Sequence, residues 1–151
     1  MVGGLALNLR GATISTEDVD VVANLDPENV DRLLAALAEL DARYKDFAGR
    51  VIRPDSNRLL GNRLNLIETR AGRIDILKSI GRDRDFRALL DLSDEMQVEE
   101  LVIRVASVEA LIEAKQVAGR EKDKLHLHFL RELQRLLAAK GSEPDPDRSG
   151  E

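Results

Sequence analysis

The stretch that decides the fold is residues 16–22, Thr-Glu-Asp-Val-Asp-Val-Val. Val19 to Val22 place one acid among β-branched residues, and this pattern predicts a strand with one face toward a core. Successive side chains of a strand point to opposite faces, so Asp18 and Asp20, two positions apart, are expected on one face. The sequence therefore predicts a core strand that presents two carboxylates side by side.

The segments around this strand predict a mixture of helices and strands. Asp26 as N-cap and Pro27 at the first helical position predict a helix that runs to about Tyr44. Further helices are expected over residues 5–9 after a turn at Gly3-Gly4, and over residues 86–92. Ser107 is expected to cap a helix that runs through Val117, and Gly119 to separate it from a last helix over residues 120–139. Further strands are expected over residues 50–52, 64–67, 73–77 and 101–105, with a hairpin turn at 70–72. The expected fold class is therefore α/β of the α+β kind, a small mixed β-sheet flanked by helices with a helical C-terminal part.

The length of 151 residues fits one compact domain, which we expect to span residues 1–140. Residues 141–151 are rich in Pro, Ser, Gly and Asp, so this acidic tail is expected to be disordered. The chain has no cysteine, which excludes disulfides, zinc ribbons and thiol chemistry and favours a reducing, cytoplasmic setting. No apolar run approaches the length of a membrane span, so no membrane partner is expected. Aromatic residues make up 3%, too few for a base-stacking platform.

Charge is strongly segregated along the chain. Residues 13–31 hold six acidic residues and no basic one, whereas residues 43–87 hold twelve basic against six acidic residues. An acidic patch beside a basic one is typical of a site that handles metal and phosphate. Charge blocks that merely solvate the outer faces of helices and strands produce the same pattern, so charge alone leaves both interpretations open.

Three features carry candidate chemistry: Gly3-Gly4, the pair Asp18 and Asp20, and Asp75 in an apolar strand. Two adjacent carboxylates raise each other's pKa unless a cation lies between them, and a hard ion such as Mg²⁺ or Mn²⁺ meets that need. If Asp75 faces the same side, the three acids form a two-metal site for phosphoryl chemistry. Two adjacent glycines let a triphosphate approach the backbone. Each feature also has an ordinary interpretation: a turn, a solvated strand face, and a hydrogen-bonded structural acid.

The order of these features resembles the nucleotidyltransferase superfamily of DNA polymerase beta type. The resemblance rests on residues 2–7 (Val-Gly-Gly-Leu-Ala-Leu), Gly11, Thr16 and the Asp-Val-Asp of residues 18–20. Residues 73–77 match the third acidic position, and residues 108–115 and 119–123 resemble the late Lys and Lys-Asp elements of that family. More narrowly, the chain is similar to small stand-alone prokaryotic members related to abortive-infection toxins, over roughly residues 2–137.

The resemblance implies a role for each of these residues. Three carboxylates would be catalytic and hold Mg²⁺ (or Mn²⁺), namely Asp18, Asp20 and Asp75. Four residues would bind the nucleotide, namely Gly3, Gly4, Thr16 and Lys115. Arg120 and Asp123 would support them, with Asp123 orienting Lys115 or Arg120.

The resemblance also implies an activity: transfer of a nucleoside monophosphate from an NTP, such as ATP, to an acceptor hydroxyl. RNA and protein both remain open as the acceptor, and the basic span 43–87 is the expected acceptor surface, above all at Arg50, Arg53, Arg58 and Arg63. A toxin-like role would add a cognate antitoxin as a partner. The alternative is a non-catalytic nucleotide-binding or regulatory module with the same fold.

Overall fold

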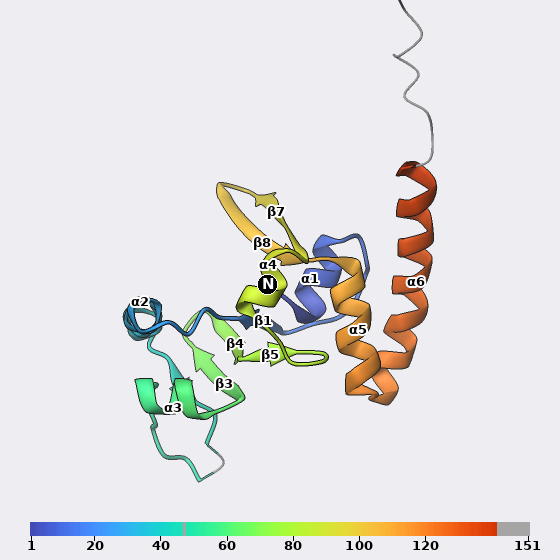
Figure 1. Ribbon diagram of the computed structural model, residues 1–151. Coiled ribbons are helices and arrows are strands. Elements are labelled where there is room, and N and C mark those ends of the chain that lie inside the picture. Colours follow the sequence, from blue (N-terminus) through green and yellow to red (C-terminus); the bar gives the residue numbers. More distant parts are fainter. Residues whose placement is uncertain (47, 142–151) are drawn as a thin grey trace, which may run out of the picture.

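The computed structural model describes residues 1–46 and 48–141 of the chain, and within them the fold is α+β (Figure 1). The helices are α1 (Gly3–Leu9), α2 (Pro27–Glu39), α3 (Ser56–Gly61), α4 (Phe86–Leu90), α5 (Val108–Ala118) and α6 (Glu121–Gly141). The strands are β1 (Asp18–Val22), β2 (Arg43–Tyr44), β3 (Leu64–Thr69), β4 (Gly72–Leu77), β5 (Ser79–Ile80), β6 (Arg84–Asp85), β7 (Ser93–Val98) and β8 (Leu101–Ala106). In this part of the chain no helix is long and apolar enough to cross a membrane. The expected tail lies outside the described residues except for Gly141, which is the last residue of α6.

The central sheet has four strands in the order β1-β4-β3-β2. β3 and β4 form the predicted antiparallel hairpin, whose turn is held by Thr69: its hydroxyl donates to the Gly72 carbonyl at 2.8 Å and accepts from the Ala71 amide at 3.1 Å. β1 pairs with β4 in parallel. A parallel pair needs a long crossover connection, and the segment that holds α2, β2, α3 and β3 provides it. The sheet is therefore mixed, as the sequence predicts.

The two faces of this sheet have different surroundings. One face packs against α2 and α3, where the buried residues are Val30, Leu37, Ala42, Leu59, Ile67 and Ile76, with Val21 and Ile74 packed against them. Because side chains alternate along a strand, the residues next to Val21 and Ile74 point to the other face. Those neighbours are Asp20 and Asp75. Burial of the aliphatic face thus determines which way the acids point.

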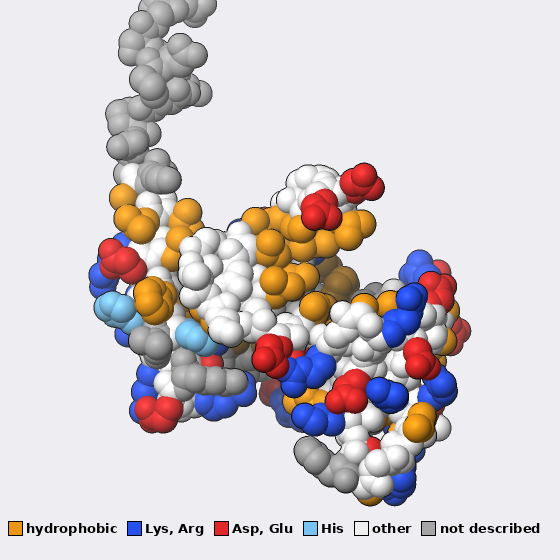
Figure 2. Space-filling view, turned by 180° about the vertical axis from the view of Figure 1, so that it is seen from behind, with side chains coloured by type: hydrophobic (Ala, Val, Ile, Leu, Met, Phe, Trp, Pro, Cys, Tyr) orange, Lys and Arg blue, Asp and Glu red, His pale blue; other side chains and the backbone are white. Residues whose placement is uncertain are grey.

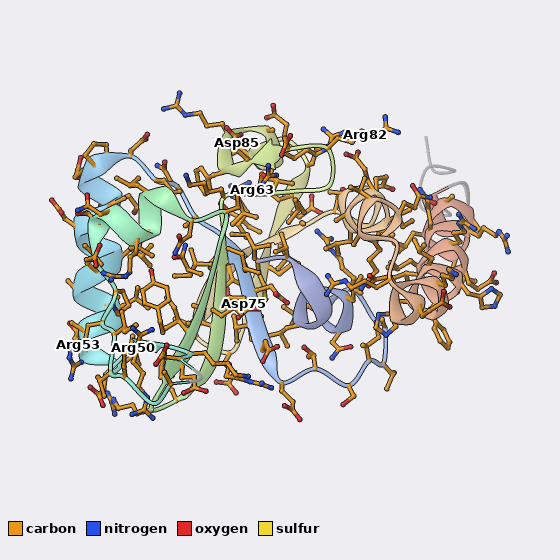
Figure 3. The ribbon with its side chains drawn as sticks, turned by 90° about the horizontal axis from the view of Figure 1, so that it is seen from below. Arg50, Arg53, Arg63, Asp75, Arg82 and Asp85 are labelled. Atoms are coloured by element: carbon orange, nitrogen blue, oxygen red, sulfur yellow. The ribbon has the colours of Figure 1, made fainter. Side chains whose placement is uncertain are left out.

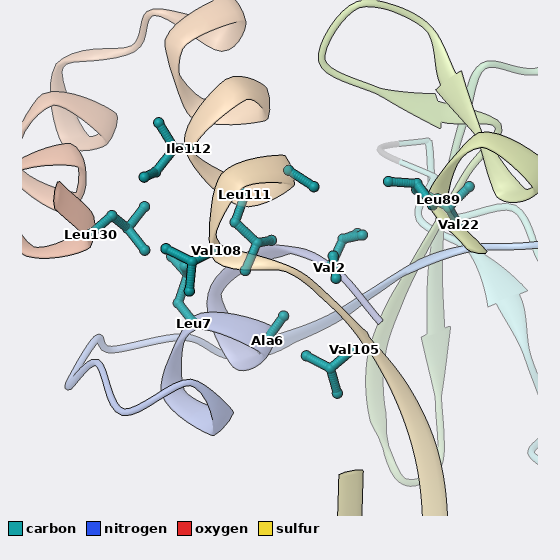
Figure 4. Close-up of a cluster of buried hydrophobic side chains, with 12 residues drawn as sticks. Val2, Ala6, Leu7, Val22, Leu89, Val105, Val108, Leu111, Ile112 and Leu130 are labelled. Carbon is teal, nitrogen blue, oxygen red and sulfur yellow. The ribbon is translucent and has the colours of Figure 1, made fainter. Parts of the chain in front are cut away.

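A second hydrophobic cluster lies beside β1 and joins the N-terminal helix to the C-terminal helices (Figure 4). Leu7 of α1, Val105 of β8 and Leu130 of α6 are fully buried in it, and Leu111 of α5 is 2% exposed. Ser107 caps α5 by accepting a hydrogen bond from the Ala110 amide at 3.3 Å, as expected. Gly119 ends α5 in the left-handed conformation (φ 61°), so α6 folds back along α5. This packing brings three distant parts of the chain to one side of the sheet.

The predicted helix over residues 27–44 is too long. α2 begins at Pro27 as expected but ends at Glu39, and Asp41 takes a left-handed conformation (φ 50°). The next residues form β2, in which Arg43 pairs with Glu68 and Tyr44 with Ile67. The edge of the sheet offers these residues backbone hydrogen bonds that a helix extension would forgo. Residues 50–52 were expected to form a strand and do not; the Ile52 carbonyl only accepts from the Tyr44 amide, at 2.8 Å.

Strand β7 was not predicted, and it forms a projecting hairpin with β8. Figure 2 shows apolar side chains along this hairpin and acidic ones at its end. The hairpin is anchored by Arg10, the C-cap residue of α1. Its guanidinium donates to the carbonyls of Val105 (2.7 Å) and Ala106 (3.1 Å) and forms an ion pair with Asp94 (2.7 Å). α3, β5 and β6 were also not predicted. These pieces are short, and tertiary contacts rather than local periodicity stabilise them.

Candidate active site

Asp20 of β1 and Asp75 of β4 are register partners in the parallel pair, and Asp18 is the register partner of Arg73. Paired residues on neighbouring strands point to the same face, so all three acids and Arg73 share the face opposite α2 and α3. Figure 3 shows Asp75 near the middle of the molecule. Asp75 therefore shares the face of Asp18 and Asp20, which is the condition that the sequence analysis set for a two-metal site.

These acids lie in a cleft of about 420 Å³, a size typical of small-molecule sites. It brings together all nine residues that the sequence singled out: Gly3, Gly4, Thr16, Asp18, Asp20, Asp75, Lys115, Arg120 and Asp123. They come from α1, the loop after it, β1, β4 and the α5–α6 pair. The cleft therefore unites segments at both ends of the chain.

The two glycines pack closely against the acidic strand. The Val2 amide donates to the Asp20 carbonyl at 2.9 Å, which places Gly3 beside the Asp20 side chain. A Cβ on Gly3 would lie 1.9 Å from Asp20 Oδ2, and the φ of +70° is itself one that favours glycine. A Cβ on Gly4 would lie 2.8 Å from Thr16 Oγ1. Both positions thus require glycine, because the backbone approaches the site more closely than a side chain allows.

Two of the acids, Asp20 and Asp75, have raised pKa values. Burial raises the pKa of Asp20 above its usual value, and the charges of Asp75 and Asp18 raise it further, against a hydrogen bond from the Gly4 backbone and the charge of Lys115. Burial and the charge of Asp18 also raise the pKa of Asp75, against Arg73 and Lys45. Clustered negative charge is therefore unfavourable in the protein as it stands.

Asp18 has a cationic partner that sequence reasoning did not identify. Arg73 Nε lies 2.7 Å from Asp18 Oδ1, and the same guanidinium also pairs with Glu17. Asp18 Oδ1 is buried, and the contact lacks the geometry of a hydrogen bond, so this oxygen accepts none. Arg73 precedes Asp75 by two positions on one strand. That spacing is the signal by which Arg73 was recognisable as part of the same face.

The α5–α6 pair contributes a buried ion-pair cluster. Lys115 Nζ donates to Asp123 Oδ1 at 2.9 Å, and Arg120 Nε lies 3.2 Å from Asp123 Oδ2. Asp123 is 2% exposed. Burial alone raises the pKa of Asp123, but the hydrogen bond and charge of Lys115, with the charge of Arg120, bring it below its usual value. Asp123 therefore contacts both cations that the resemblance offered as its partners.

Part of the cleft wall is formed by the β5–β6 hairpin, a pair of strands that the sequence analysis did not predict. Ser79, Ile80 and Gly81 line the cleft. Glu113 of α5 holds this hairpin by accepting from the Arg84 guanidinium at 2.6 Å and from the Arg82 amide at 3.3 Å. His126, which the sequence analysis did not single out, also lines the cleft.

The donor atoms of the site fit a hard divalent cation, because Mg²⁺ and Mn²⁺ prefer carboxylate oxygens and Asp18 Oδ1 is a buried oxygen that accepts no hydrogen bond. The side chains are not, however, gathered as ligands: across residues 1–46 and 48–141, no three His, Asp or Glu residues form a group that could hold a metal ion. Asp18, Asp20 and Asp75 would be the ligands, and Asp18 is paired with Arg73 in the metal-free protein.

The basic residues expected to receive an acceptor do not form one surface. Arg50 and Arg53 lie at one end of the central strands and Arg63 and Arg82 at the other (Figure 3). The four arginines named from the sequence each pair with an acid: Arg50 with Asp46, Arg53 with Asp41, Arg58 with Asp55 and Arg63 with Asp83. Each of these four positive charges thus has a negative charge beside it. The basic span 43–87 therefore does not act as one continuous positive surface for an acceptor.

In comparisons with known proteins, no protein-family model and no curated protein matches this chain.

Proposed function

We propose that the protein is a nucleotidyltransferase, which transfers a nucleoside monophosphate from an NTP to an acceptor hydroxyl and releases pyrophosphate. The observation that carries the proposal is the register pair Asp20 and Asp75, with Asp18 on the same face. These acids share a cleft with Gly3 and Lys115, so the groups needed for a metal and for a phosphate chain are adjacent.

In this proposal the three acids hold one or two divalent ions. When bound, Mg²⁺ or Mn²⁺ neutralises the triphosphate and stabilises charge that develops during transfer. The acceptor oxygen forms a bond to the α-phosphorus while the bond to the pyrophosphate oxygen breaks. The hydroxyl proton passes to Asp75, the acid to which the resemblance assigns activation of the acceptor hydroxyl.

The remaining residues bind and position the nucleotide. Lys115 offers a single ammonium charge to the phosphates, and its side chain is 15% exposed, so little water competes for it. Asp123 fixes that ammonium through the hydrogen bond at 2.9 Å. Gly3 and Gly4 leave the backbone open to the phosphate chain.

The second candidate is a nucleotide-binding or regulatory module without catalysis. One observation favours it: the described residues contain no group of three side chains arranged to hold a metal ion. Both candidates require NTP binding in the same cleft, and only the first requires transfer.

The decisive experiment incubates the protein with each α-³²P-labelled NTP, Mg²⁺, RNA and cell lysate. We expect label on RNA or on a protein, with pyrophosphate released, from the parent chain and from Asp83→Asn. Asp83 is a matched control because it is a 75% exposed acid outside the cleft. Asp75→Asn should transfer no label. NTP binding without transfer by the parent would favour the non-catalytic module, and neither binding nor transfer would contradict both candidates.

A further inference from the structure

We infer that Arg73 is an internal counter-ion that occupies Asp18 in the metal-free protein and competes with the divalent cation for that carboxylate. The inference rests on the proposed function, because it concerns metal entry to the same site. Its geometric basis is the ion pair of 2.7 Å between Arg73 Nε and Asp18 Oδ1 and the register pairing of these two residues on β1 and β4.

The competition follows from the arrangement of four side chains. Asp18 and Arg73 form one register pair, and Asp20 and Asp75 form the next pair on the same face. These two pairs therefore hold three carboxylates and one guanidinium. The contact between Arg73 and Asp18 is an ion pair without hydrogen-bond geometry, so charge attraction alone holds it. While Arg73 contacts Asp18 Oδ1, that oxygen cannot also coordinate a metal ion. The metal-free protein therefore has the Arg73 charge at the place where a divalent ion would contact Asp18.

Glu17 supplies the alternative position for Arg73. Its carboxylate already pairs with the Arg73 guanidinium, and its side chain is 80% exposed, outside the cleft. When a divalent ion takes Asp18, Arg73 can keep Glu17 as its partner and need not remain an unpaired charge. Glu17 therefore eases the release of Asp18, and Arg73 and Glu17 act on metal affinity in opposite directions.

Binding of Mn²⁺ alone, measured by the loss of its free EPR signal, tests this inference without any transfer assay. Arg73→Gln should bind Mn²⁺ about tenfold or more tightly than the parent. Glu17→Gln should bind it more weakly, because Arg73 then has only Asp18. A merely structural role for Arg73 predicts the reverse of the first result, since a loosened site binds metal less well.

Lys45→Gln separates contact from general charge. Lys45, like Arg73, lowers the pKa of Asp75 through its charge, so its removal takes a similar positive charge from the site. Lys45 acts on Asp75 through its charge, whereas Arg73 forms the ion pair with Asp18, so we expect Lys45→Gln to change Mn²⁺ affinity less than Arg73→Gln. Arg73→Lys keeps the positive charge but replaces the guanidinium with a smaller ammonium group. Its Mn²⁺ affinity should lie between those of the parent and Arg73→Gln.

Equal Mn²⁺ affinity in the parent and Arg73→Gln, or equal gains in Arg73→Gln and Lys45→Gln, would overturn the inference and leave the proposed function standing. If neither the parent nor any of these variants bound Mn²⁺ at millimolar concentration, the metal chemistry and the inference would both be wrong. Binding by Arg73→Gln alone would support the inference most strongly.

Discussion

Asp20 and Asp75 stand opposite each other on the parallel strands β1 and β4, and the adjacent pair on the same face is Asp18 and Arg73. Three carboxylates with one guanidinium is an unfavourable arrangement for a protein without bound cations, because like charges at this spacing repel. The hydrophobic clusters on both sides of the sheet hold the strands in this register nonetheless. Carboxylates that repel one another in the empty protein, and whose repulsion a bound cation would relieve, are typical of functional sites.

Asp20→Asn should be at least as stable as the parent protein in EDTA. The change removes one of three like charges and keeps both the shape of the side chain and an acceptor for the Gly4 amide. The variant should also lose any rise in melting temperature that Mg²⁺ with NTP gives the parent. Thermal melts of both proteins, with EDTA and with Mg²⁺ plus NTP, measure both effects. If Asp20 is instead a structural acid, the change should lower the free energy of unfolding by about 1–3 kcal/mol under both conditions.

The advantage of Asp20→Asn should depend on pH. The pKa of Asp20 is higher in the folded than in the unfolded protein, so protonation of Asp20 stabilises the fold. This stabilisation is complete at pH values below the pKa of the unfolded state, and it is lost as the pH rises through the pKa of the folded state. The difference in free energy of unfolding between variant and parent should therefore be largest near neutral pH and shrink on acidification. Urea titrations in EDTA across this pH range give the difference.

Asp46→Asn provides the control of opposite sign. The hydrogen bond from Arg50 lowers the pKa of Asp46, so the ionised form stabilises the fold above the unfolded pKa, and this is lost as pH falls through the folded pKa. Asp46→Asn should thus be less stable than the parent near neutral pH. The same sign of effect in both variants would contradict the assignment of repulsion to Asp20.

Gly3→Ala should destabilise the protein more than Gly11→Ala. Both glycines have positive φ, +70° and +100°, so both variants bear backbone strain of about 1 kcal/mol. Only at Gly3 does the new Cβ meet another group, 1.9 Å from Asp20 Oδ2; at Gly11 nothing lies within 4 Å. Gly3→Ala should in addition abolish stabilisation by NTP. Melting temperatures with and without NTP test this, and equal losses in the two variants would mean that the close approach of Gly3 has no energetic consequence.

Lys115→Met should destabilise the protein, because it leaves the buried carboxylate of Asp123 with Arg120 alone. Removing one partner of a buried ion pair typically costs about 3–5 kcal/mol, and the remaining Arg120 places this case at the lower end. The double variant Lys115→Met with Asp123→Leu should regain much of that stability, since the buried charge is gone. It should still fail to bind NTP.

Lys124→Ala is the matched lysine control for NTP binding, because Lys124 is 65% exposed and pairs with Glu121 outside the cleft. It should bind NTP as the parent does. A full recovery of NTP binding in the Lys115→Met and Asp123→Leu double variant would show that Lys115 serves the fold alone.

The sequence by itself predicted the elements whose pattern is local and periodic. The patterns of residues 19–22 and 73–77 predicted β1 and β4 to within one residue at their starts. The shared face of Asp18 and Asp20 was also predicted, because a side chain's face follows directly from the two-residue period of a strand. Pro27 predicted the start of α2, although Asp26, the expected N-cap, makes no side-chain cap hydrogen bond there. Ser107 and Gly119 predicted both ends of α5, because a cap hydrogen bond and a left-handed backbone depend on neighbouring residues only.

Only the tertiary structure decided the pairings between distant segments. Whether Arg73 lies opposite Asp18 depends on the register of β1 and β4, and packing against α2 and α3 sets that register. β2 and β7 exist because a partner strand supplies their hydrogen bonds, and neither segment has a pattern of its own strong enough to predict it. Lys115 lines the same cleft as the acids because Leu111 of α5 and Leu130 of α6 are buried in one cluster with residues of α1. Such contacts are cooperative and join residues far apart in sequence, so no local pattern specifies them.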